Sequence, residues 1–104
     1  MAQFDVYRNP NPATSAVVPY LLNVQSDLLD RLATRVVVPL VRAAELEHTA
    51  AQLNPRFEIE GQAVVMSTPE LAGLPQRALG GRVLSLQHRR DEIIAALDLL
   101  FTGI

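Results

Sequence analysis

The chain has 104 residues, of which 49% are hydrophobic, with nine basic and eleven acidic side chains. This length predicts a single domain over residues 1–104, with enough apolar side chains for one modest core. The net charge of −2 excludes an electrostatic footprint for binding nucleic acid unaided. Because cysteine and lysine are absent, disulfides, thiolate nucleophiles, cysteine metal sites and Schiff-base chemistry are also excluded. Neither a signal sequence nor an apolar stretch near the ~20 residues that cross a bilayer is visible, so we expect a cytoplasmic protein with no membrane partner.

The first half of the chain predicts three strands. Residues 3–7 alternate apolar and polar side chains, and residues 17–25 place Tyr20, Leu22 and Val24 on one face. A loop with two prolines separates these two runs. Pro19, near the start of the second run, indicates an edge position or a bulge. Residues 35–41 contain three consecutive valines, which favour a strand buried on both faces, and Pro39 predicts a bend or bulge within it.

The middle of the chain predicts a hairpin preceded by an ambiguous segment. Residues 43–53 read locally as a helix, but their apolar face is thin and mostly alanine, so a long loop is equally compatible. Residues 56–60 alternate cleanly, with Glu58 and Glu60 on the outer face, and Gly61-Gln62 can turn this strand into a second one at 63–66. Thr68-Pro69 can then open a single helical turn that Gly73 ends.

The last segment predicts an amphipathic helix. Ser85 can cap it, and Gly103 is a natural left-handed stop, beyond which Ile104 can fold back on the last turn. Its apolar residues recur at spacings near three and four and form one stripe: Leu86, Ile93, Ile94, Leu97, Leu100 and Phe101. The residues therefore predict a mainly antiparallel β domain with one C-terminal helix.

Few residues are arranged for catalysis. His48 and His88 lie on separate polar stretches without metal-ligand spacing, and they are most simply surface histidines. The serines lack a glycine-flanked nucleophile turn, and Gly80-Gly81 lacks the strand-turn-helix context of a phosphate cradle. We therefore expect no catalytic residue, no cofactor and no metal.

The chain ends in an unusually apolar segment at residues 99–104. Termini are normally frayed and polar unless something holds them. This end can close the protein's own core, form the seam of a homodimer, or bind another partner. Under the second alternative, we expect Leu100 at the dimer interface.

A series of short motifs spans nearly the whole chain. In order, they are Gln3-Phe4-Asp5-Val6-Tyr7, the segment from Asn23-Val24-Gln25-Ser26 to Asp30, Arg35-Val36-Val37-Val38-Pro39-Leu40, the approach from Leu53-Asn54-Pro55 to Gly61, Leu86-Gln87-His88-Arg89, and Phe101-x-Gly103-Ile104. Their order, spacing and terminal position resemble the CcdB family of bacterial toxins, the toxin half of toxin–antitoxin pairs.

The resemblance implies a twisted antiparallel sheet shaped like a small SH3-like barrel, of the CcdB/MazF type, with a terminal helix and a two-fold homodimer. Proteins similar to this one do not catalyse a reaction. They bind the A subunit of DNA gyrase and trap the enzyme on cleaved DNA. A cognate antitoxin wraps its disordered C-terminal arm around the toxin, and the complex represses its own operon, with DNA bound only through the antitoxin.

Carried over by position, the resemblance implies that gyrase binds two segments. The first holds Leu28 and Leu29, and the second, at the helix end, holds Asp98, Phe101, Thr102, Gly103 and Ile104. Two residues depart from the family pattern: Thr102 stands where the family has a tryptophan, and Asp98 stands where it has an amide. Aromatic anchors dominate interface energies, so the loss of one predicts weaker binding.

Two alternatives to a gyrase poison stay open at this point. A protein of the same fold with a weakened or shifted target would act mainly as an antitoxin-dependent co-repressor. A MazF-like endoribonuclease shares the fold, but that family relies on an N-terminal strand motif rich in basic and glycine residues, which residues 3–9 lack.

Overall fold

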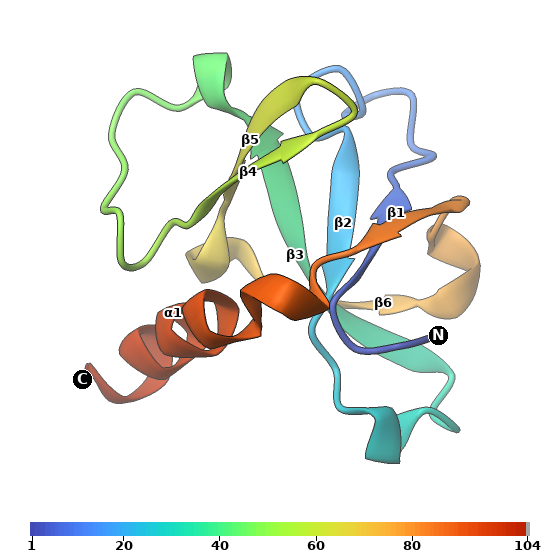
Figure 1. The fold of residues 1–104 in the computed structure, drawn as a ribbon. Helices are drawn as coiled ribbons and strands as arrows, with labels where there is room; N and C mark the ends of the chain where they lie inside the picture. The colour runs from blue at the N-terminus through green and yellow to red at the C-terminus, as the bar shows by residue number, and fades with distance from the viewer. Residues whose placement is uncertain (104) are drawn as a thin grey trace.

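The computed structural model describes residues 1–103 and is built on one curled antiparallel sheet (Figure 1). The sheet order is β4-β5-β3-β2-β1-β7, and β6 pairs with β3 beside β5. The elements are β1 (Asp5–Arg8), β2 (Tyr20–Asn23), β3 (Thr34–Arg42), β4 (Arg56–Ile59), β5 (Gln62–Met66), β6 (Ala72–Pro75), β7 (Arg82–Ser85) and α1 (Arg90–Thr102). The sheet curls into a half-barrel, which confirms the predicted mainly β fold with a C-terminal helix.

The long strand β3 is the centre of the sheet, and it accommodates Pro39 without a bulge. Its pairing with β2 runs in unbroken register from Tyr20 opposite Leu40 to Asn23 opposite Val37, so the bulge predicted as one alternative at Pro39 is wrong. On its other side, β3 pairs with β6 over residues 34–37 and with β5 over residues 40–42. Pro39 lies between these two partners, where its carbonyl accepts from the Ser67 amide at 3.0 Å and no strand needs its missing N–H.

Pro19 likewise precedes β2 rather than interrupting it. β2 starts at Tyr20 and lies between β1 and β3, so the predicted edge position is wrong. The irregularity in the sheet falls elsewhere, between Val6 and Tyr7 in the pairing of β1 with β7.

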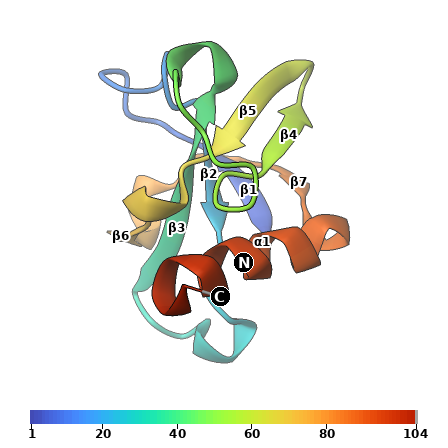
Figure 2. The same ribbon diagram turned by 90° about the vertical axis from the view of Figure 1, so that its left-hand side faces the viewer.

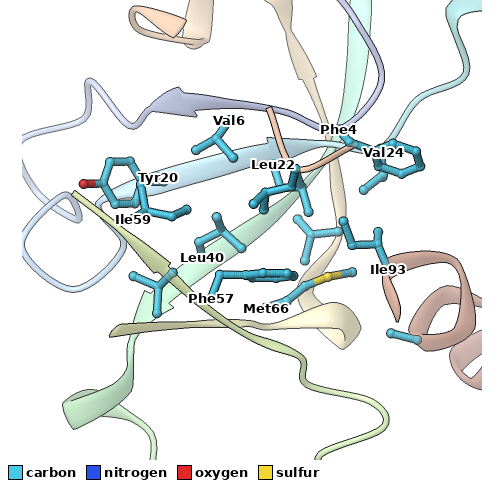
Figure 3. Close-up of a cluster of buried hydrophobic side chains, with 14 residues drawn as sticks. Phe4, Val6, Tyr20, Leu22, Val24, Leu40, Phe57, Ile59, Met66 and Ile93 are labelled. Carbon is cyan, nitrogen blue, oxygen red and sulfur yellow. The ribbon is translucent and has the colours of Figure 1, made fainter. Parts of the chain in front are cut away.

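The core fills the concave side of the sheet and extends to the helix (Figure 3). Side chains of β1, β2, β3, β4 and β5 meet there, including fully buried Leu22, Leu40 and Ile59. Ile93 and Ala96 are the buried residues of α1, and Ile93 lies near Met66 and Phe57 in the close-up. At the start of the helix, the Arg89 guanidinium stacks 4.7 Å above the Phe57 ring. One narrow stripe of α1 therefore docks it against the hairpin side of the sheet.

Residues 43–53 form a loop rather than the alternative helix. Only Ala43–Glu45 make a short 3-10 turn, because the alanine-rich segment offers little apolar surface to bury. Asn54 closes the loop: its side-chain oxygen accepts from the Ala50 amide, and its nitrogen donates to the Met66 carbonyl at 3.0 Å. Thr68–Glu70 form the predicted single helical turn, with Pro69 in its first positions. The turn ends at Leu71, and Gly73 lies within β6 opposite Val36, so only the predicted stop at Gly73 is wrong.

The predicted hairpin is confirmed as β4 and β5, with a turn one residue earlier than predicted. Ile59 pairs with Gln62, which leaves Glu60 and Gly61 as the two loop residues. Both have positive φ, 53° and 77°, as a type I′ turn requires. Glu60 is therefore a turn residue and does not share the outer strand face with Glu58.

The helix begins later than predicted and ends where predicted. Ser85 belongs to β7, and its hydroxyl accepts from the Gln87 amide at 3.1 Å to start a 3-10 turn ahead of α1. Gly103 stops the helix with φ of 74°, and its amide donates to the Leu99 carbonyl at 3.0 Å. Ile104, and its predicted packing on the last turn, lie outside the described residues.

Gly80 permits a close approach of the chain to β1. Its amide donates to the Arg8 carbonyl at 2.8 Å, and a Cβ at this position would lie 2.7 Å from that same oxygen. We expect Gly80→Ala to lower the free energy of unfolding by about 1–3 kcal/mol, because the backbone must shift. Gly81→Ala is the matched control: its Cβ would meet no atom within 4 Å, and we expect a change of about 0.5 kcal/mol or less. Equal effects in urea unfolding would contradict this assignment.

Candidate functional site

Two separate elements expose large apolar side chains. The β2–β3 connection (residues 24–33) presents Leu28, Leu29 and Leu32, which are 94%, 50% and 51% exposed. The C-terminal end of α1 presents Phe101, which is 70% exposed. A leucine or phenylalanine so fully in water contributes little to the protein's own core. Clusters of such side chains are typical of protein–protein binding surfaces.

Polar contacts, rather than burial, shape the β2–β3 connection. Its 3-10 turn, η1 (Asp27–Leu29), contains no buried residue. The Ser26 hydroxyl caps the turn by accepting from the Leu28 amide, and the Asp27 carboxylate accepts from the Gln3 amide at 2.7 Å. Asp27 thus starts the turn, and Asp30 caps its end. Of the leucines between them, Leu28 is almost fully exposed and Leu29 is half-exposed.

The helix end brings four of the predicted gyrase-binding residues together. Asp98, Phe101, Thr102 and Gly103 are all exposed within the last turn of α1 and its cap. The Thr102 hydroxyl donates to the Asp98 carbonyl at 2.7 Å, so this hydroxyl is already occupied within the helix. The side chain of Thr102 therefore offers a partner its methyl group and an acceptor oxygen, but no proton to donate. The fifth predicted residue, Ile104, lies outside the described residues.

The two apolar elements lie apart in the chain. In Figure 1, η1 is at the bottom of the molecule, below the sheet, whereas the end of α1 points away to the left. Figure 2, turned by 90°, shows both on the lower side of the molecule. The structure therefore keeps Leu28 and Leu29 together, and the helix-end residues together, but does not merge the two groups. Leu100, the predicted dimer residue, is half-buried on α1.

A polar cluster links β1 and β2 to the β4–β5 turn. Glu60 accepts two hydrogen bonds from the Arg8 guanidinium, at 2.8 and 2.9 Å, and one from the Tyr20 hydroxyl at 2.6 Å. These bonds stabilise the carboxylate and lower the pKa of Glu60 to about 2. The fixed cation and hydroxyl also hold Glu60 in its left-handed backbone conformation. The cluster thus joins elements far apart in the sequence rather than forming a reactive site.

The Glu60 cluster gives stability a distinct pH dependence. Because its pKa is lower in the folded protein, its contribution is complete above the unfolded value near 4.5 and is lost as pH falls towards about 2. We expect Glu60→Gln to unfold more easily than the natural protein at pH 7, with the difference shrinking through this acidic window. Glu58→Gln, two residues away on β4, serves as control. Thermal melts that show a pH-independent difference for Glu60→Gln would contradict this role.

Groups suited to acid–base or metal chemistry do not converge in the described part of the chain. One groove of about 360 Å³ lies between α1 and residues 51–55. Its titratable lining residue, Glu92, is paired with Arg89, which lowers the Glu92 pKa. Across residues 1–103, no three histidine, aspartate or glutamate side chains gather as a metal site would require. Within the same residues, no helix is both long and apolar enough to span a membrane.

Comparison with known families gives one match that spans this architecture. A family model described as CcdB protein matches residues 3–103. The chain belongs to the CcdB family. The match includes β1 at one end, both exposed apolar elements, and the Gly103 cap at the other. Membership in the CcdB family supports a role as the toxin of a toxin–antitoxin system, with an antitoxin as its partner.

Sequence reasoning missed the polar residues that hold the CcdB-family fold and its exposed connection in place. Arg8 and Glu60 are separated by 52 residues, and no local pattern predicts their pairing. Gln25 and Arg35 are buried polar residues, 8% and 3% exposed, next to the β2–β3 connection. Both lie within motifs that carry the family resemblance, but no local pattern distinguishes them from exposed polar residues.

Proposed function

We propose that this protein is a gyrase-directed toxin that acts by binding and not by catalysis. It binds the A subunit of DNA gyrase and holds the enzyme on cleaved DNA, and a cognate antitoxin neutralises it. The observation that carries the proposal is the exposure of Leu28 and Phe101, 94% and 70%, on two elements of a CcdB-family chain. Large side chains exposed to this extent supply the apolar anchors that protein interfaces use.

The net charge of the chain supports separate roles for the toxin and its antitoxin in DNA binding. A net charge of −2 provides no general attraction for DNA, so we propose that operon repression uses the antitoxin for DNA contact. The toxin then contributes protein–protein contacts to the repressing complex.

Direct binding to the gyrase A subunit tests the proposal. Isothermal titration calorimetry should give a saturable complex with the A subunit and none with the B subunit, used at the same concentration. The Leu28→Ala variant should bind more weakly while its circular dichroism spectrum stays unchanged, because this side chain is almost fully exposed. Natural protein that fails to bind the A subunit would reject the gyrase assignment.

A homodimer is part of this proposal. Leu99 and Leu100 are only half-buried in a single protomer, and they adjoin exposed Phe101, so the helix end leaves apolar surface uncovered. We expect a partner copy to cover Leu100. Light scattering at micromolar concentration should give twice the mass of 11.4 kDa. A stable monomer mass for the natural protein would contradict the dimer. The Leu100→Glu variant should have a mass shifted from that of the dimer towards that of the monomer.

A weakened or shifted target is the second candidate function, and the helix end favours it. Asp98 adds a negative charge near the helix C-terminus, where the helix dipole already places partial negative charge. Threonine at position 102 supplies no large aromatic side chain as an anchor, and its hydroxyl already donates to the Asp98 carbonyl. Such a protein would act mainly with its antitoxin as an operon co-repressor.

A further inference from the structure

The β2–β3 connection is held by two buried polar side chains, one at its own start and one in the strand that follows it. Arg35, at the start of β3, is 3% exposed although it carries a positive charge. Gln25, just after β2, is 8% exposed. Burying a charge is costly unless hydrogen bonds and an opposite charge compensate it. What these side chains contact therefore indicates why they are buried.

Arg35 makes three hydrogen bonds to the connection and one to the carbonyl of its own neighbour in β3, Thr34. One terminal nitrogen of its guanidinium donates to the carbonyls of Leu32 and Thr34, at 2.5 and 2.9 Å. The other donates to the carbonyl and the carboxylate of Asp30, at 2.5 and 3.1 Å. Its charge is thus compensated by one half-exposed carboxylate and three backbone carbonyls. A planar fork can satisfy acceptors on both sides at once, which a lysine ammonium cannot do.

Gln25 fixes the other half of the connection. Its side-chain nitrogen donates to the Leu29 carbonyl at 2.9 Å, and its oxygen accepts from the Val36 amide at 3.0 Å. One side chain thus ties η1 directly to β3. With no residue of η1 buried, Arg35 and Gln25 take the place of a local apolar core.

We propose that Arg35 is a positioning residue that holds Leu28 and Leu29 in the conformation that the gyrase A subunit binds. This inference rests on the proposed function for the identity of the partner. Preorganisation matters here because ordering a free loop upon binding reduces affinity. Without the guanidinium, the connection keeps its leucines but samples several conformations.

Arg35→Lys tests the proposal because it preserves the charge and removes the fork. Arg8→Lys is the matched control, since Arg8 makes an equally forked ion pair with Glu60 and no hydrogen bond to the connection. Hydrogen exchange should be followed at the amides of Leu28, Leu29, Asp30 and Leu32, which all donate within the connection. Affinity for the gyrase A subunit should be measured at a temperature where every variant is folded.

We expect Arg35→Lys to speed exchange at these four amides by about tenfold or more, with the amides of β2 and β3 unchanged. Affinity for the A subunit should fall by about tenfold or more, because the ordering cost moves to the binding step. Arg8→Lys should change neither. Asp30→Ala removes one acceptor at a half-exposed position and should give a smaller change in the same direction, so the proposal stays testable if Arg35→Lys does not fold.

Two results would overturn the proposal. Exchange at these amides could stay at the natural rate in Arg35→Lys and Asp30→Ala, which would show that other contacts order the connection. Alternatively, exchange could rise while affinity stays unchanged, which would give Arg35 a purely structural role. If the natural protein does not bind the A subunit, the proposed function fails instead, and exchange alone then decides whether Arg35 orders the connection.

Discussion

Phe101→Ala is expected to weaken binding to the gyrase A subunit by about 30-fold or more while leaving the fold intact. Buried aromatic anchors at interfaces are worth about 2–4 kcal/mol on truncation, and a tenfold change in affinity corresponds to about 1.4 kcal/mol. The phenylalanine is 70% exposed in the free protein, so its removal costs the core little. Calorimetry with the purified A subunit measures the affinity, and thermal melts measure the stability.

Val17→Ala is the matched control for Phe101→Ala. Val17 is also an exposed apolar residue, 41% accessible, but it belongs to the loop between β1 and β2 rather than to either proposed binding element. We expect the Val17→Ala variant to bind the gyrase A subunit with the same affinity as the natural protein. Equal losses for both variants would indicate a non-specific apolar contribution, and no loss for Phe101→Ala would place the binding surface elsewhere.

Thr102→Trp is expected to strengthen gyrase inhibition by about two orders of magnitude. An indole buries ~150–250 Å², and at ~25 cal/mol per Å² the added contact approaches ~3 kcal/mol above that of the threonine methyl group. The substitution also gives up the hydrogen bond from the Thr102 hydroxyl to the Asp98 carbonyl. This loss of about 1 kcal/mol lowers the stability of the helix in the free and the bound protein alike, so it does not reduce the gain in affinity. Supercoiling assays with purified gyrase measure the change in inhibitory concentration.

Thr102→Val is the control that removes the hydroxyl without adding an aromatic side chain. Valine keeps the shape of threonine, and the hydroxyl already bonds within the helix, so inhibition should stay at the natural level. Circular dichroism should show the same fold for all three proteins. Natural protein as inhibitory as Thr102→Trp would show that no anchor is missing at this position.

The alternating and β-branched segments were predictable from the sequence because their local pattern and their burial agree. The valine run became the central strand β3, and the run from Arg56 to Ile59 became β4. The bulge predicted at Pro39 is absent because a proline disturbs a strand only where a neighbouring strand needs its missing N–H. Pro39 lies in the gap between the partners β5 and β6. Glu60 was misjudged because distant Arg8 and Tyr20 stabilise it in a turn.

The candidate site was predictable only in part, and by two different routes. The apolar helix end was predictable from residues 99–104, four of which are leucine, phenylalanine or isoleucine. Leu28 and Leu29 came from the family resemblance, since nothing in the local pattern indicates that they are exposed. Arg35 could not be singled out among nine arginines, because its acceptors are backbone carbonyls that only the folded connection brings together.

Trapping of cleaved DNA by gyrase tests the central claim most directly. Purified gyrase is incubated with supercoiled plasmid, ATP and this protein, then denatured and digested with protease, and linear DNA is measured. We expect linear DNA to accumulate with the natural protein, to accumulate at far lower concentrations of Thr102→Trp, and to disappear when the cognate antitoxin is added. Both the natural protein and Thr102→Trp should be tested up to concentrations that saturate their binding to the antitoxin. If the plasmid stays uncleaved with both, the result would contradict gyrase poisoning and favour the co-repressor function.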